Sequence, residues 1–143
     1  MKDYLIEQNC KKAIDTNILD YAFRNDNLEL KSKSINLFMN ENIVVSHFVS
    51  IEFIHTTHTV SKIDKYDTLK FVIEFLGITN TNYYYLETYD FAHFIMKRYQ
   101  IPLKDSIIIA DAILNDCPIL YSRDMQYNQL FEKKTRIINP FKL

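Results

Sequence analysis

Short apolar runs of strand length alternate along this chain with longer segments of helical period. The expected strands are residues 10–14, 42–45, 83–86, 118–121 and 136–138. The expected helices begin at about residue 18, span 28–38, follow a capping serine at position 46, and then span 66–76, 89–99 and 105–115. Strands that alternate with helices in this way predict an α/β fold, with a parallel sheet covered by helices on both faces.

The length and composition narrow the class of protein further. The chain has 143 residues and no linker, repeat or low-complexity tract, so we expect a single domain over residues 1–143. Its one glycine, Gly77, is expected to end a helix, which leaves none for a P-loop or a dinucleotide-binding loop. The balance of 17 basic against 18 acidic residues indicates no particular partner.

The sequence also indicates the compartment. The two cysteines, Cys10 and Cys117, have no metal-binding or redox spacing and are expected to be reduced thiols. No segment has the pattern of a signal peptide or of a membrane span. We therefore expect a soluble protein of the cytoplasm with no membrane partner.

Acidic residues occur where the expected strands end. Asp15 follows the first strand, Asp124 lies just beyond the fourth, and Asp105 opens an apolar helix. Glu52 lies two turns into the helix after the second strand and can point back toward the same edge. Each acid alone fits a structural role, such as capping of a helix by Asp105. Together, four carboxylates at one edge of a sheet repel each other unless cations neutralise them, which favours Mg²⁺ or Mn²⁺.

Four sequence motifs, in this order, resemble those of PIN domains. They are DTNIL at 15–19, Ser46 followed six residues later by Glu52, DSIIIA at 105–110, and LYSRD at 120–124. The resemblance covers nearly the whole chain. The size and the single-domain form look most like the toxin half of VapBC-type toxin–antitoxin pairs.

The resemblance implies a three-layer α/β/α fold around a parallel sheet of four to five strands, and a metal-dependent endoribonuclease. Asp15, Glu52, Asp105 and Asp124 would then be the catalytic acids and the ligands of one or two Mg²⁺ or Mn²⁺ ions. Water activated by such a cation would hydrolyse the RNA backbone and leave a 5′-phosphate and a 3′-hydroxyl. The implied partners are RNA, a cognate antitoxin and a second copy of the chain in a homodimer.

Residues beside the four acids have supporting roles in this interpretation. We expect Thr16 or Asn17 to cap the first helix and to orient the carboxylate before it. Ser122 is expected to bond a metal ligand or a phosphate, or to serve only its own turn. Arg123 and Lys104 adjoin proposed catalytic residues and are the candidates for contacts with RNA phosphate.

Other patterns allow different interpretations. Glu52, His55 and His58 have the composition of a zinc site, but the ends of this series are about 120° apart around a helix. Tyr83–Tyr85 are expected to pack in the core or at an interface rather than to stack on bases. As alternatives to a toxin, the chain is a PIN nuclease of RNA processing without an antitoxin, or a non-catalytic PIN-like module that binds RNA or protein.

Overall fold

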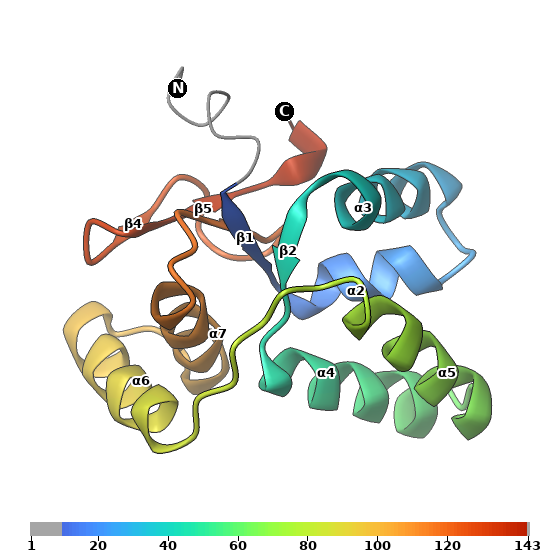
Figure 1. Ribbon diagram of the computed structural model, residues 1–143, viewed down its shortest axis with the longest axis horizontal. Helices are drawn as coiled ribbons and strands as arrows, with labels where there is room; N and C mark the ends of the chain where they lie inside the picture. The colour runs from blue at the N-terminus through green and yellow to red at the C-terminus, as the bar shows by residue number, and fades with distance from the viewer. Residues whose placement is uncertain (1–9, 143) are drawn as a thin grey trace.

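A five-stranded sheet with the strand order β2-β1-β3-β5-β4 lies at the centre of the fold (Figure 1). The computed structural model describes residues 10–142; the start of the chain, where no signal peptide is expected, lies outside them. The strands are β1 (Lys11–Ile14), β2 (Asn42–Val44), β3 (Ile119–Tyr121), β4 (Leu130–Phe131) and β5 (Thr135–Ile138). The first four in spatial order are parallel, and β4 is antiparallel to β5. The predicted parallel sheet is confirmed, with one short antiparallel strand at its edge.

Six α-helices flank the sheet in the part of the chain that the structure describes. They are α2 (Thr16–Phe23), α3 (Leu28–Asn40), α4 (His47–Ile54), α5 (Lys65–Leu76), α6 (Leu86–Tyr99) and α7 (Leu103–Leu114). A π-helical segment, η1 (His55–Val60), continues α4, and η2 (Pro140–Lys142) is a short 3₁₀ helix. Crossovers between the parallel strands, which are right-handed as a rule, place α2 and α3 on one face and α6 and α7 on the other (Figure 1). The predicted three-layer α/β/α arrangement is confirmed. No helix among the described residues is long and apolar enough to cross a membrane.

The apolar composition of the strands follows from burial on both faces of the sheet. Ile14, Leu120 and Ile137 are each at most 1% exposed. Lys12 is the buried polar residue of β1, and its ammonium lies 2.9 Å from a carboxylate oxygen of Glu41. This pairing explains how a lysine is accommodated in a central strand, since a buried charge is tolerated when it is paired.

The expected strand at 83–86 is wrong. This segment has no regular strand structure, and α6 begins at Leu86. The backbone amide of Asn82 donates to Asn115 Oδ1 at 2.8 Å, and Asn115 Nδ2 donates to the Asn82 carbonyl at 3.0 Å. The backbone at Asn82 thus forms hydrogen bonds with the Asn115 side chain and not with the backbone of a neighbouring strand. Tyr83–Tyr85 are consequently exposed rather than in the core, and Tyr85 is 82% exposed.

The ends of two helices match the sequence cues. The Ser46 side chain accepts from the Phe48 backbone amide at 3.2 Å and caps α4, as expected. Gly77 ends α5, also as expected, but with a right-handed φ of −63°. The glycine is therefore not required there by a left-handed backbone conformation.

Candidate active site at the carboxyl ends of the strands

The order in which the chain adds strands to the sheet reverses between β1 and β3. From β1 the chain crosses to β2 on one side, and from β3 it crosses to β5 on the other. These two strands are neighbours, and the backbone amide of Asp15 donates to the Tyr121 carbonyl at 2.8 Å. Ligands of open α/β sheets bind outside the carboxyl ends of the strands at such a switch point. The residues that follow β1 and β3 therefore occupy the position where this fold places a functional site.

Three hydrogen bonds hold the Asp15 carboxylate at the end of β1. Oδ1 accepts from the Thr16 backbone amide at 2.7 Å, so Asp15 itself caps α2. Oδ2 accepts from the Ser122 hydroxyl at 2.8 Å and from the Asn17 amide at 3.4 Å. The expectation that Thr16 or Asn17 caps this helix is wrong, because both residues already lie inside it. Burial raises the pKa of the Asp15 carboxyl, against the bonds from Ser122 and Thr16 that lower it.

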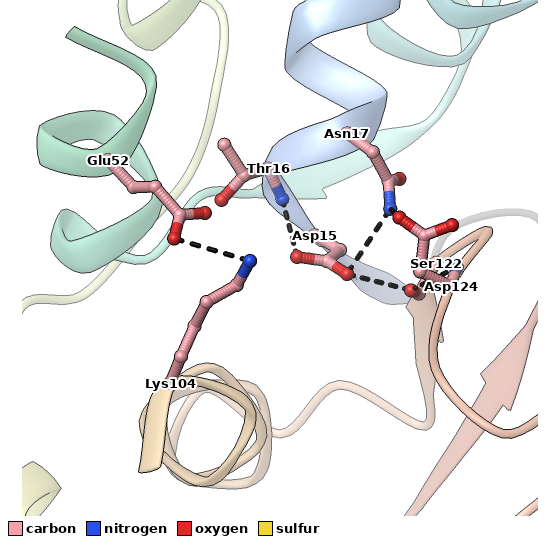
Figure 2. Close-up of polar contacts among 7 residues, drawn as sticks. All are labelled: Asp15, Thr16, Asn17, Glu52, Lys104, Ser122 and Asp124. Carbon is pink, nitrogen blue, oxygen red and sulfur yellow. Dashed lines mark hydrogen bonds and ion pairs between the residues drawn. The ribbon is translucent and has the colours of Figure 1, made fainter. Parts of the chain in front are cut away.

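Asn17 and Ser122 connect the end of β1 to the turn after β3 (Figure 2). Asn17 Nδ2 contacts the carboxylates of both Asp15 and Asp124, and donates to Asp124 Oδ2 at 3.1 Å. Ser122 Oγ donates a hydrogen bond to Asp15. It also accepts hydrogen bonds from the backbone amides of Asp124, at 3.2 Å, and Met125, at 3.0 Å. Both residues thus orient a carboxylate, and Ser122 serves its own turn as well.

Glu52 reaches the site from α4, and Lys104 reaches it from the first turn of α7. Lys104 Nζ lies 3.3 Å from Glu52 Oε2 (Figure 2). The Lys104 side chain is 49% exposed, whereas that of Glu52 is 21% exposed. Partial burial lowers the pKa of the Lys104 ammonium, but Glu52, Asp15 and Asp105 outweigh it and leave the pKa raised. Lys104 therefore carries its positive charge among the four acids.

Asp105 lies in the first turn of α7 but does not cap the helix. The helix begins before it with Pro102 at the cap position, so the interpretation of Asp105 as a structural cap is wrong. Burial, and then the charge of Asp15, raises the pKa of the Asp105 carboxyl, whereas Lys104 lowers it. Asp105 also shares the lining of a hollow of about 180 Å³ with Asp124. These two acids therefore face one space between α7 and the turn after β3.

The donor set of this site suits a hard divalent cation. Carboxylate oxygens are the ligands that Mg²⁺ and Mn²⁺ prefer. Burial is the largest cause of the raised pKa values of Asp15 and Asp105, and repulsion between like charges adds to it. The charge of Glu52 raises the pKa of Asp15, and the charge of Asp15 raises the pKa of Asp105. A bound cation would relieve this repulsion. As the side chains stand, no three His, Cys, Asp or Glu residues within 10–142 are arranged to hold one ion together, which also leaves the zinc interpretation of Glu52, His55 and His58 without support.

A fifth acid, Asp20 of α2, interacts with this cluster and was not expected from the motifs. Burial raises its pKa to about 6; Arg24 lowers the pKa, and the charges of Glu52 and Asp15 raise it. Asp20 Oδ1 is buried and has no hydrogen-bond partner in the structure. The sequence carries one signal for it: Asp20 lies one helical turn after Thr16, on a mostly apolar helix.

Arg123 lies beside the turn that carries Ser122 and Asp124, but its side chain is directed toward α2. Its guanidinium donates a hydrogen bond to the Tyr21 hydroxyl and lies 5.5 Å from the centre of that ring. The side chain is exposed. Arg123 thus presents a positioned positive charge next to the acids rather than among them.

A second and larger hollow, of about 510 Å³, lies between α4, α6 and α7 and includes Tyr83–Tyr85 and Asp111 in its lining. The Asp111 carboxylate accepts hydrogen bonds from the hydroxyls of Thr88, at 2.6 Å, and Ser46. Burial raises the pKa of this carboxyl, and the two hydroxyls lower it. These partners give Asp111 a structural role that is separate from the four acids.

Known proteins provide a comparison with this geometry. The model of the PIN domain family matches residues 12–132. No curated protein matches the chain in sequence. VapBC2 from Rickettsia felis, bound to a DNA fragment of its promoter, is similar in structure with a TM-score of 0.62 and 18% identity, over 90% of this chain and 98% of that chain. FitAcB from Neisseria gonorrhoeae is similar with a TM-score of 0.64 and 17% identity, over 92% of this chain and 99% of that chain.

A further similar structure is VapC20 from Mycobacterium tuberculosis, a toxin that cleaves the sarcin–ricin loop. Its TM-score is 0.65 at 11% identity, over 80% of this chain and 91% of that chain. At such identities the solved structures establish a common fold. The family model covers most of the chain, including all four acidic motifs and the whole region between them. The chain belongs to the PIN domain family.

Proposed function

We propose that this PIN protein is an endoribonuclease that depends on Mg²⁺ or Mn²⁺, with Asp15, Glu52, Asp105 and Asp124 as its catalytic acids. The observation that carries the proposal is the gathering of carboxylates from four separate segments at the switch point of the sheet. Such a cluster opposes folding through its own repulsion, and one or two bound cations would reverse that cost.

The chemistry follows from the charges of the site. The four acids would hold the cation, which when bound makes a water molecule more acidic and stabilises negative charge on the phosphate. The Asn17 amide donates hydrogen bonds to the carboxylates of both Asp15 and Asp124 and so holds them in fixed positions relative to each other. Ser122 fixes the orientation of the Asp15 carboxylate. These three hydrogen bonds limit the rotation of the acids, which preorganises the site.

Two basic residues are suited to bind the RNA backbone. The Lys104 ammonium lies within the acidic cluster, and the Arg123 guanidinium lies beside it against Tyr21. Positive charge at these positions favours a phosphate despite the near-neutral formal charge of the chain, −1. Both side chains are exposed enough to meet a substrate from solvent.

We further propose that the protein is a cytoplasmic toxin of a type II toxin–antitoxin pair and forms a homodimer. The similarity to VapBC and FitAcB complexes supports an antitoxin partner. Large apolar side chains that are exposed on the helices support protein interfaces wherever they form a contiguous patch. Examples on three helices are Ile51, Tyr66, Ile73, Leu86 and Tyr89. A short upstream gene for a small DNA-binding protein would favour the toxin, and its absence would favour a nuclease of RNA processing.

The test is metal-dependent cleavage of a cellular RNA pool by the purified protein, with EDTA as the metal-free control. Asp15→Asn and Asp105→Asn should each lower the rate at least about a hundredfold, because each removes one negative charge from the metal-binding acids. Asparagine caps helices as well as aspartate does, so Asp15→Asn should keep the start of α2. Asp90→Asn, on the exposed face of α6, is the matched control and should cleave normally.

Two results would contradict the proposal. Undiminished cleavage by both site variants, in protein with normal circular dichroism, would place the activity elsewhere. No cleavage and no Mn²⁺ binding by the unaltered protein at millimolar metal would instead favour a non-catalytic PIN-like module.

A further inference from the structure

A positive charge is already present inside the acidic cluster. Lys104 places its ammonium 3.3 Å from Oε2 of Glu52. Figure 2 shows this ammonium between the carboxylates of Glu52 and Asp15, directed into the site from α7. Its charge acts on Asp15 and on Asp105 as well. Lys104 therefore neutralises part of the same negative charge that a divalent cation would neutralise.

The contact between Lys104 and Glu52 is of a kind that breaks easily. About half of the Lys104 side chain is exposed, so its ammonium can move from Glu52 into water without being buried alone. Exposed ion pairs contribute only about 0–1 kcal/mol to stability. Lysine also carries its charge on a flexible stem of four carbons, which allows several positions from one backbone site.

A lysine at this position and a divalent cation oppose each other. A carboxylate oxygen of Glu52 that faces the ammonium is screened from a metal ion, and the ammonium repels any dication held by Asp15 and Asp105.

We infer that Lys104 is a built-in counter-cation: it neutralises the acidic centre of the metal-free protein, and it leaves Glu52 when all four acids hold a divalent ion. The inference rests on the metal site proposed above and assigns to Lys104 the control of metal affinity. The lysine thus stabilises the metal-free fold and weakens metal binding, two effects of opposite sign from one charge. An ion pair with only a structural role would produce the first effect without the second.

The test compares the unaltered protein with Lys104→Met, which keeps an unbranched side chain shorter by one atom and removes its charge. Mn²⁺ binding is measured by titration calorimetry, and thermal unfolding by circular dichroism in EDTA. Lys104→Met should bind Mn²⁺ about tenfold more tightly. Without metal it should melt roughly 3 °C lower, and Mn²⁺ should restore the melting temperature.

Two further variants separate the charge of Lys104 from other effects. Lys104→Arg keeps the charge beside Glu52 and should bind Mn²⁺ no more tightly than the unaltered protein. Lys33→Met removes a lysine that pairs with Glu29 at 3.1 Å on α3, and should change neither measurement. If Lys104→Met does not fold, Lys104→Gln replaces it in the same comparison.

The outcomes distinguish the inference from the proposed function. Mn²⁺ affinity of Lys104→Met equal to or below that of the unaltered protein overturns the role of Lys104 and leaves the proposed metal site intact. Tighter binding by Lys104→Arg as well would show that loss of the lysine shape, not of its charge, is responsible, and also overturns it. Absence of Mn²⁺ binding in every variant overturns the metal site itself.

Discussion

Replacement of Asp20 by asparagine should stabilise the metal-free protein, although Asp20 is an acid beside the candidate active site. Its pKa is raised from 3.8 to about 6, first by burial, with Arg24 opposing and Glu52 and Asp15 adding to the rise. A rise of about two units corresponds to roughly 3 kcal/mol against the ionised form. Because Asp20 is partly exposed, solvent screening reduces this to about 1–2 kcal/mol. Asparagine keeps the shape of the side chain and removes the charge.

The pH dependence follows from proton binding in the two states. Between about pH 4 and pH 6 the folded protein holds a proton on Asp20 that the unfolded chain releases, so the contribution of Asp20 to stability falls as pH rises through this window. Above about pH 6 both states are ionised and the full penalty is present. Asp20→Asn should therefore be more stable than the unaltered protein at pH 7.5, and the difference should nearly vanish at pH 4.

Urea unfolding followed by far-ultraviolet circular dichroism, in EDTA, measures this difference. With a typical slope of about 2 kcal/mol per molar urea, the midpoint at pH 7.5 should rise by roughly 0.5–1 M. Asp90→Asn is the control for loss of an exposed acid and should leave the midpoint unchanged. An Asp20→Asn protein that is no more stable at pH 7.5, or whose gain is equally large at pH 4, would refute the electrostatic reasoning.

Two other substitutions test the site and the core. Asn17→Ala removes the amide that contacts Asp15 and Asp124, so Mn²⁺ affinity measured by calorimetry and the cleavage rate should each fall roughly tenfold. An unchanged Mn²⁺ affinity would mean that the amide does not orient these two carboxylates for metal binding. Phe53→Ala empties a fully buried position whose ring packs against those of Phe23 and Phe71, with centroids at 5.6 and 5.2 Å, and should cost about 3–5 kcal/mol in urea unfolding. A loss below about 1 kcal/mol would indicate that the three rings do not pack as described.

The sequence predicts the layout of this fold well where local pattern and tertiary environment agree. The run at β3 is apolar because both faces of the sheet are covered, so this strand can be recognised from residue type alone, whereas β1 begins with two lysines. The position of Asp15 follows from the same pattern, since the carboxyl ends of parallel strands meet at one edge. The strand pattern therefore predicts that Asp15 and Asp124 lie at the same edge of the sheet, whereas the pairing of β1 with β3 is seen only in the structure.

The error at 83–86, and two features that the motifs do not show, depend on partners distant in the sequence. Tyr83–Tyr85 have the composition of a strand, but the backbone beside them bonds to the side chain of Asn115, which no local pattern indicates. Asp20 belongs to none of the four motifs, and its raised pKa arises from burial and from Glu52 on another helix. The ion pair of Lys104 with Glu52 likewise joins residues of α7 and α4. Such contacts require the folded arrangement.

The pairing of β1 with β3 also determines when the candidate site can form during synthesis. Ser122 bonds Asp15 across 107 positions of the chain, and Asn17 bonds Asp124 across the same separation. A nascent chain folds from its N-terminus as it is made, yet β1 then lacks its neighbour on the side where the acids meet. A chain that has not been translated past Asp124 cannot assemble the four acids. If the proposed activity is correct, the protein does not cleave RNA while most of it is still being synthesised.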